Sequence, residues 1–273
     1  MISIMTRVLA AMIAVAGMAG SVQASDWSIS EDARNRIEPV LKKSGGQLTY
    51  FEGPSGMIGV GVTFTNGRQM VAYATPDGST LFSGAAVNVE TGVNLSVADL
   101  KKLPPPDYAG LVEMVAEEGA VTMKSEGNPD SENRYFVFVD PKCPYCHKAY
   151  NSFLTLLADG HDLVVHYIPV SVLGPESENT AKEMIALPQK ESLALFRSLA
   201  KREPHLSDRA KVERGNLGYY KNMALFRQLQ LDAVPVIMSD VSGTYNVRRG
   251  MVTAEALQQE LKVAKVQKMA AAQ

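Results

Sequence analysis

The sequence predicts two domains of different fold class. The first is an α+β domain with one helix and a small antiparallel sheet, and a linker helix joins it to an α/β domain with a helical insertion. Three observations predict this division. Short stretches rich in β-branched and aromatic residues alternate with turn residues between 47 and 87, a Leu-Pro-Pro-Pro run interrupts the chain at 103–106, and apolar strand and helix patterns alternate from residue 134 onward. A chain of 273 residues is also longer than one typical domain.

Residues 1–24 are typical of an export signal. Arg7 supplies a positive start, residues 8–20 form an apolar core, and the small residues at 22–24 suit cleavage. The apolar core is shorter than the roughly 20 residues that a membrane-spanning helix needs. We therefore expect the mature chain to begin near Ser25, in a compartment outside the cytosol where two cysteines meet oxidising conditions. The formal net charge of −2 favours neither nucleic acid nor an anionic membrane as a partner.

The N-terminal domain is predicted over residues 25–100. Ser28 followed by Glu31 predicts a capping box at the start of its helix, and glycines at 45–46 end that helix. Strands are expected at 47–51, 58–64, 69–74 and 80–87, with the Asn66-Gly67 pair as a hairpin turn. The region contains no cysteine or histidine, so we expect no chemistry in it. Because a small sheet leaves unpaired edges, we expect it to join two copies in a homodimer.

The linker and its helix are predicted over residues 101–127. The three prolines favour an extended, semi-rigid segment, and Asp107 can cap a helix that carries Leu111, Met114 and Val115. The polar stretch 125–133 is expected to be a loop. The segment is either an ordinary connection or a spacer that sets the distance between two active sites, and the sequence leaves both open.

The C-terminal domain is predicted over residues 128–273. Strand 134–139, helix 144–158 and strand 162–168 come first, then a helical insertion over 171–231. Strands at 234–238 and 244–248 and a helix after Thr253 follow. A βαβ unit followed by ββα is the thioredoxin arrangement, and the insertion is expected to cover its active site.

The chemistry is predicted to lie at Cys143 and Cys146, the only two cysteines. Cys143 comes where a buried strand passes into a helix, and the free N–H groups and positive dipole end of a helix favour thiolate over thiol. Pro144 suits the first helical position. Cys146 lies one turn further along and can close on Cys143, while Lys142 can stabilise the thiolate from the other side. This arrangement predicts a redox-active dithiol with Cys143 as the attacking sulfur.

The two cysteines have two other possible roles, a structural disulfide and a zinc site. A structural disulfide would close a four-residue ring and would remove little entropy from the unfolded chain. The spacing to His161 and His166 also satisfies a zinc-finger pattern, but His166 lies within a predicted buried strand and residues five apart on an extended chain face opposite ways. We therefore expect no metal and no cofactor. His147 is expected to be a solvated helix residue rather than a catalytic base.

Three motifs carry a family resemblance: Phe-Val-Asp-Pro-Lys-Cys-Pro-Tyr-Cys at 138–146, Val-Leu-Gly-Pro-Glu-Ser at 172–177 and Ala-Val-Pro at 233–235. They resemble the periplasmic thiol:disulfide isomerases of the DsbC/DsbG family, nearest the DsbG branch. The resemblance implies a homodimer joined through its N-terminal domains, with a cleft between two catalytic domains. It also implies that Cys143 is the nucleophile, that Cys146 resolves, and that Pro235 is a cis-proline facing them. A membrane thiol reductase of the DsbD type is the implied electron donor.

The residue before that proline departs from the family. Val234 stands where these isomerases usually have threonine, and valine is typical of oxidases of the DsbA type. The segment around it, together with Pro144 and Tyr145 between the cysteines, is expected to line the active site. The absence of the additional cysteine pair found in the DsbC branch favours the DsbG branch.

The function expected from the sequence is a thiol–disulfide oxidoreductase, an isomerase or reductase that acts on exported proteins with cysteines or disulfides. Two alternatives remain beside it. One is a dithiol oxidase of the DsbA type. The other is a holdase chaperone, which would bind unfolded chains in an apolar cleft and for which the cysteines would be secondary.

Overall fold

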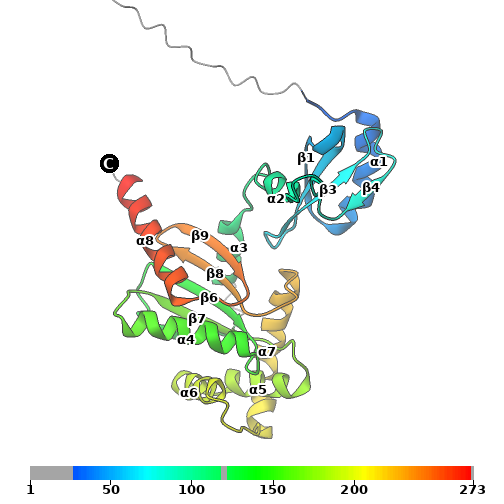
Figure 1. The fold of residues 1–273 in the computed structure, drawn as a ribbon. Helices are drawn as coiled ribbons and strands as arrows, with labels where there is room; N and C mark the ends of the chain where they lie inside the picture. The colour runs from blue at the N-terminus through cyan, green and yellow to red at the C-terminus, as the bar shows by residue number, and fades with distance from the viewer. Residues whose placement is uncertain (1–26, 118–121, 272–273) are drawn as a thin grey trace, which may run out of the picture.

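The chain forms two sheets, each with its own helices (Figure 1). The structure is a computed structural model that describes residues 27–117 and 122–271. The predicted export signal at 1–24 lies outside the described residues. Within the described ranges, no helix is both long enough and apolar enough to cross a membrane.

The N-terminal sheet is a four-stranded antiparallel meander in chain order, covered by one helix, as predicted. Ala33 and Ile37 of the helix are buried against the sheet. Ser30 caps the helix and accepts a hydrogen bond from the Ala33 N–H, so the expectation that Ser28 is the cap is wrong by two residues. The elements are α1 (Glu31–Leu41), the 3₁₀ turns η1 (Lys42–Ser44) and η2 (Pro54–Gly56), β1 (Gln47–Glu52), β2 (Ile58–Thr63), β3 (Gln69–Ala74) and β4 (Leu81–Ser83).

The end of this domain differs from the prediction. The last strand stops at Ser83 instead of 87, and a short helix, α2 (Leu95–Leu100), follows an irregular segment. Asn94 caps α2, and the buried Asp99 in α2 accepts a hydrogen bond from the Tyr73 hydroxyl at 2.8 Å. A six-residue helix shows too little periodicity to be recognised in sequence.

The C-terminal sheet has five strands in the order β5-β7-β6-β8-β9. Its central strand β6 runs parallel to β7 and antiparallel to β8. The strands are β5 (Lys124–Gly127), β6 (Asn133–Val139), β7 (Val164–Pro169), β8 (Val236–Val241) and β9 (Thr244–Arg249). The predicted loop at 125–133 is therefore wrong at its start, because β5 pairs with β7 as an edge strand.

Helices cover both faces of this sheet (Figure 1). One buried cluster joins α4 (Pro144–Ala158), α6 (Gln189–Ala200) and α8 (Ala254–Ala271) to one face. The other joins α3 (Tyr108–Glu117), α5 (Pro175–Ala186) and α7 (Arg209–Gln228) to the opposite face. Leu111 and Val115 of α3 are buried in this second cluster, so the helix expected in the linker packs on the C-terminal sheet. The predicted fold class is confirmed, including the helical insertion between β7 and β8.

Candidate active site

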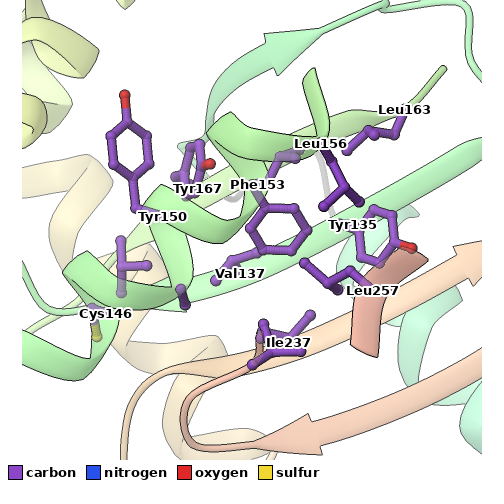
Figure 2. Close-up of a cluster of buried hydrophobic side chains, with 14 of the residues drawn as sticks. Tyr135, Val137, Cys146, Tyr150, Phe153, Leu156, Leu163, Tyr167, Ile237 and Leu257 are labelled. Atoms are coloured by element: carbon purple, nitrogen blue, oxygen red, sulfur yellow. The ribbon is translucent and has the colours of Figure 1, made fainter. Parts of the chain in front are cut away.

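The two cysteines lie where β6 passes into α4. Cys143 is the N-cap residue of α4, with extended backbone angles, and Pro144 occupies the first helical position. The Cys143 N–H donates to the Asp140 carbonyl at 3.0 Å, which closes the turn after the strand. Cys143 is 5% exposed and Cys146 is fully buried. Figure 2 shows Cys146 at one end of the core that contains Val137 and Phe153. The strand-to-helix position predicted for the pair is confirmed.

The two thiols differ sharply in acidity. Hydrogen bonds from the Cys146 side chain and from the backbone N–H groups of Cys146 and Tyr145 lower the pKa of Cys143 to about 6, although burial and the charge of Asp140 oppose them. Burial raises the pKa of Cys146 far above its ordinary range. At neutral pH Cys143 is therefore the thiolate and Cys146 the protonated thiol that hydrogen-bonds to it.

A proline loop faces Cys143. The Val234–Pro235 peptide bond is cis, as expected. The Cys143 Sγ lies 3.8 Å from the Val234 carbonyl oxygen, which accepts the hydrogen bond when the thiol is protonated. The Val234 side chain packs against both buried clusters of the domain. Directly after the proline, β8 begins and pairs with β6, so the central strands of the sheet hold this loop opposite the dithiol.

Asp140 is a site residue that the sequence analysis did not single out. Its carboxylate is fully buried. One oxygen accepts hydrogen bonds from the Lys142 N–H and the Ser177 hydroxyl, and the other accepts from the N–H groups of Val172 and Leu173 at 2.8 and 3.1 Å. The carboxylate thus ties the dithiol loop to the segment before α5. The only sequence signal was the joint presence of the 138–146 and 172–177 motifs.

Lys142 does not act as predicted. Its Nζ forms an ion pair with the Glu176 carboxylate at 2.7 Å, which adds a second connection between the same two segments.

The histidines have structural partners. His147 is half-buried, its Nε2–H donates to the Pro141 carbonyl at 2.6 Å, and its ring meets Phe196 edge-on, so the expectation of a solvated residue is wrong. Burial lowers the pKa of His147, which is therefore neutral at pH 7. His166 hydrogen-bonds to Ser125 at 2.7 Å, and His161 lies 3.3 Å from the Gln258 amide nitrogen. Among the described residues, no group of three metal-ligating side chains could hold an ion.

Exposed apolar side chains come from three segments at the dithiol. Tyr145, between the cysteines, is 58% exposed. Val172 and Leu173, which Asp140 holds, are exposed as well. Met251 follows Gly250, whose N–H donates to the Pro235 carbonyl at 2.8 Å, and is also exposed. Exposed apolar side chains thus lie between the cysteines and on the two segments that are hydrogen-bonded to Asp140 and to Pro235.

Comparisons with known proteins agree with this geometry. A family model described as a thioredoxin-like domain matches residues 124–265. The chain is 27% identical over 164 residues to the thiol:disulfide interchange protein DsbG of Pseudomonas aeruginosa, covering 59% of this chain and 62% of the relative. It is 26% identical over 160 residues to DsbG of Escherichia coli K12, covering 58% of this chain and 62% of the relative.

The solved structures that match include the catalytic domain of ScsC from Proteus mirabilis. That match has 18% identity and a TM-score of 0.45, and it covers 57% of this chain and 96% of the ScsC domain. The alignments to DsbG span somewhat less than two thirds of DsbG itself. The predicted relationship to DsbG is confirmed as a distant one. Since the family model matches more than half of its residues, the chain belongs to the thioredoxin-like domain family.

Proposed function

We propose that this protein is a thiol:disulfide oxidoreductase that acts as an isomerase or reductase on exported proteins in the periplasm. The observation that supports it most is the unequal pair of thiols, with a thiolate at Cys143 and a buried, protonated Cys146 beside it. The DsbG relatives are thiol:disulfide interchange proteins, which agrees with this chemistry.

The reaction follows from the positions of the two sulfurs. The Cys143 thiolate attacks one sulfur of a substrate disulfide, a mixed disulfide forms, and the other substrate sulfur leaves as a thiolate. For isomerisation, a second substrate thiolate attacks the mixed disulfide and Cys143 leaves unchanged. For reduction, Cys146 loses its proton and attacks Cys143 Sγ, the substrate leaves with both thiols reduced, and the protein is oxidised by two electrons. A low thiol pKa favours the isomerase route because it makes Cys143 a good leaving group.

The reductase route requires an electron donor. We propose a membrane thiol reductase of the DsbD type, which would return the Cys143–Cys146 disulfide to the dithiol. Pro144, Tyr145, Val234 and Pro235 are proposed to contact the substrate chain around the mixed disulfide.

A homodimer through the N-terminal domain belongs to the same proposal. The edge strand β4 exposes Phe82, and the segment after it exposes Val87, Val89 and Val93, of which Val89 is 96% exposed. An unpaired sheet edge beside exposed apolar side chains is a surface that a second copy could cover.

Refolding of a scrambled disulfide protein tests the proposal. The wild type should restore the substrate's activity with catalytic amounts of a thiol buffer, Cys143→Ser should be inactive, and Cys146→Ser should accumulate the mixed disulfide. Equilibration with glutathione then separates an isomerase or reductase from an oxidase of the DsbA type. If the protein were chiefly a holdase, the variant lacking both cysteines would suppress aggregation as well as the wild type and the wild type would show no turnover.

A further inference from the structure

The turn between β2 and β3 reaches from the N-terminal sheet to the C-terminal domain. The hairpin closes where the Phe64 N–H donates to the Arg68 carbonyl at 2.8 Å, and Gly67 has a φ of 74°. The loop is thus three residues long with a left-handed glycine at its end. Asn66 lies at the tip, where a side chain is ordinarily solvated, yet it is only 5% exposed.

The groups that cover Asn66 belong to the other domain. Its Nδ2 donates to the Gln230 carbonyl at 3.0 Å, and its own carbonyl accepts from Arg249 Nη2 at 2.9 Å. Its Oδ1 accepts from the Arg68 N–H at 2.9 Å and holds the turn itself. One asparagine therefore uses its donor and its backbone acceptor across the domain boundary and its side-chain acceptor within the hairpin.

Gly67 completes the contact. A Cβ added there would lie 2.6 Å from the ring of Tyr108 and 3.2 Å from the Leu111 side chain, both in α3. Glycine is thus required twice, by the left-handed backbone and by the close approach to α3. A weaker ion pair joins Arg68 to Asp232 at 4.0 Å.

The two residues of the C-terminal domain that Asn66 contacts lie on the two chain segments next to the cis-proline loop. Gln230 lies in the loop that leads to Val234, and its φ of 50° places a non-glycine residue in the left-handed region. Arg249 is the strand partner of Val236, the residue after Pro235. The next residue, Gly250, donates its N–H to the Pro235 carbonyl. The Asn66 contacts therefore hold both chain segments between which the cis-proline loop is fixed.

We propose that Asn66 is a positioning residue for the cis-proline loop, which it braces from the N-terminal domain through its hydrogen bonds to Gln230 and Arg249. The inference rests on the proposed function, in which this loop receives the substrate chain. It gives the N-terminal domain a part in substrate binding besides dimerisation. Because coupling between two sites is reciprocal, a substrate bound at the loop would also strengthen the docking of the hairpin.

Two substitutions test the contacts of Asn66 with Gln230 and Arg249, one on each side of the domain boundary. Asn66→Asp keeps the size of the side chain and the acceptor for the Arg68 N–H but has no donor for the Gln230 carbonyl. Arg249→Ala removes the other hydrogen bond without altering the hairpin. Asn88→Asp is the matched control, since it makes the same change in a turn of the same domain, where the Asn88 side chain accepts from the Glu90 and Thr91 N–H groups.

The measurement is amide hydrogen exchange of the full-length reduced protein, read by mass spectrometry in peptides covering 229–234 and 247–251. Loss of one hydrogen bond should make these amides exchange about 3- to 10-fold faster in both test variants. Asn88→Asp should match the wild type. Unchanged exchange in either test variant, or an equal increase in the control, overturns the proposal.

Kinetics distinguish this inference from the proposed function. In Asn66→Asp the KM for a disulfide-bonded protein substrate should rise about 3- to 10-fold, while kcat and the reduction potential stay at wild-type values, because the dithiol is not touched. An unchanged KM would overturn the positioning role. If the wild type showed no turnover at all, the proposed function would fail. The exchange experiment would still decide whether the Asn66 hydrogen bonds stabilise the cis-proline loop.

Discussion

Removing the Cys146 thiol should make Cys143 a weaker acid. The hydrogen bond from Cys146 is the largest of the contributions that lower the pKa of Cys143 to about 6. A hydrogen bond to a charged group contributes about 1.5–3 kcal/mol, and 1.36 kcal/mol corresponds to one pKa unit. Cys146→Ala should therefore raise the pKa of Cys143 by about 1 to 2 units, toward the ordinary value of about 8.5.

The shift should be incomplete. The backbone N–H groups of Tyr145 and Cys146 remain at the start of α4 and continue to favour the thiolate. Cys146→Ser is the matched control, since a serine hydroxyl can still donate to the Cys143 sulfur. It should raise the pKa of Cys143 by less than Cys146→Ala does.

The assay is the ultraviolet absorbance of the thiolate against pH, followed in parallel by the rate of alkylation of Cys143. The wild type should be about ten parts thiolate to one part thiol at pH 7, one unit above its pKa. The alanine variant, with a pKa of about 7 to 8, should range at the same pH from equal parts of thiol and thiolate to about ten parts thiol to one part thiolate. An unchanged pKa in Cys146→Ala would show that the helix terminus alone acidifies Cys143. Equal rises in both variants would show that a hydrogen-bond donor at position 146 is not what lowers the pKa.

The remaining predictions concern pH, the proline loop, the buried carboxylate and the dimer. Ionisation of Cys143 should stabilise the reduced fold increasingly as pH rises from about 6 to about 8.5, because its pKa is lower in the folded chain, and urea unfolding of Cys143→Ala should lack this dependence. Val234→Thr should lower that pKa and raise the reduction potential by adding a donor beside the sulfur, measured by thiolate titration and glutathione equilibration. Asp140→Ala should reduce the free energy of unfolding by more than about 3 kcal/mol, and Ser177→Ala by about 1–2 kcal/mol, in urea denaturation. Phe82→Asp should convert a sedimenting dimer to monomers without changing the pKa of Cys143.

The dithiol could be predicted from sequence because its determinants are local. A buried strand, a turn, a cysteine and a proline follow one another within a few residues, and the helix start then acidifies the first sulfur. The cis-proline needed the family resemblance, because nothing in its own neighbourhood shows that Cys143 lies opposite. Val234, the residue before this proline, is 91 residues along the chain from Cys143, and the pairing of β6 with β8 brings the two together.

The features that the sequence analysis missed depend on distant partners. The sequence predicts Asp140 only as a turn residue after a strand. Its role as a buried hydrogen-bond acceptor depends on Val172, Leu173 and Ser177, which are more than 30 residues away along the chain. β5 lacks an apolar pattern because it is an edge strand, and its buried Lys124 is satisfied by the carbonyls of Ile185 and Leu187 at the end of α5. Such positions violate the usual correlation between polarity and exposure, on which sequence patterns rely.

The charge of Asp140 opposes the thiolate, so its place in the site needs a physical reason. It raises the pKa of both Cys143 and Cys146, yet the helix start keeps Cys143 acidic in spite of it. Four donors satisfy the two oxygens of the carboxylate, so the buried group is fully hydrogen-bonded. What the carboxylate supplies is geometry, since a single buried group fixes the dithiol loop and the exposed Val172–Leu173 segment in one arrangement. The Asp140 charge thus makes the Cys143 thiolate somewhat less stable, while its hydrogen bonds fix the position of the dithiol loop relative to the apolar segment that is proposed to hold the substrate.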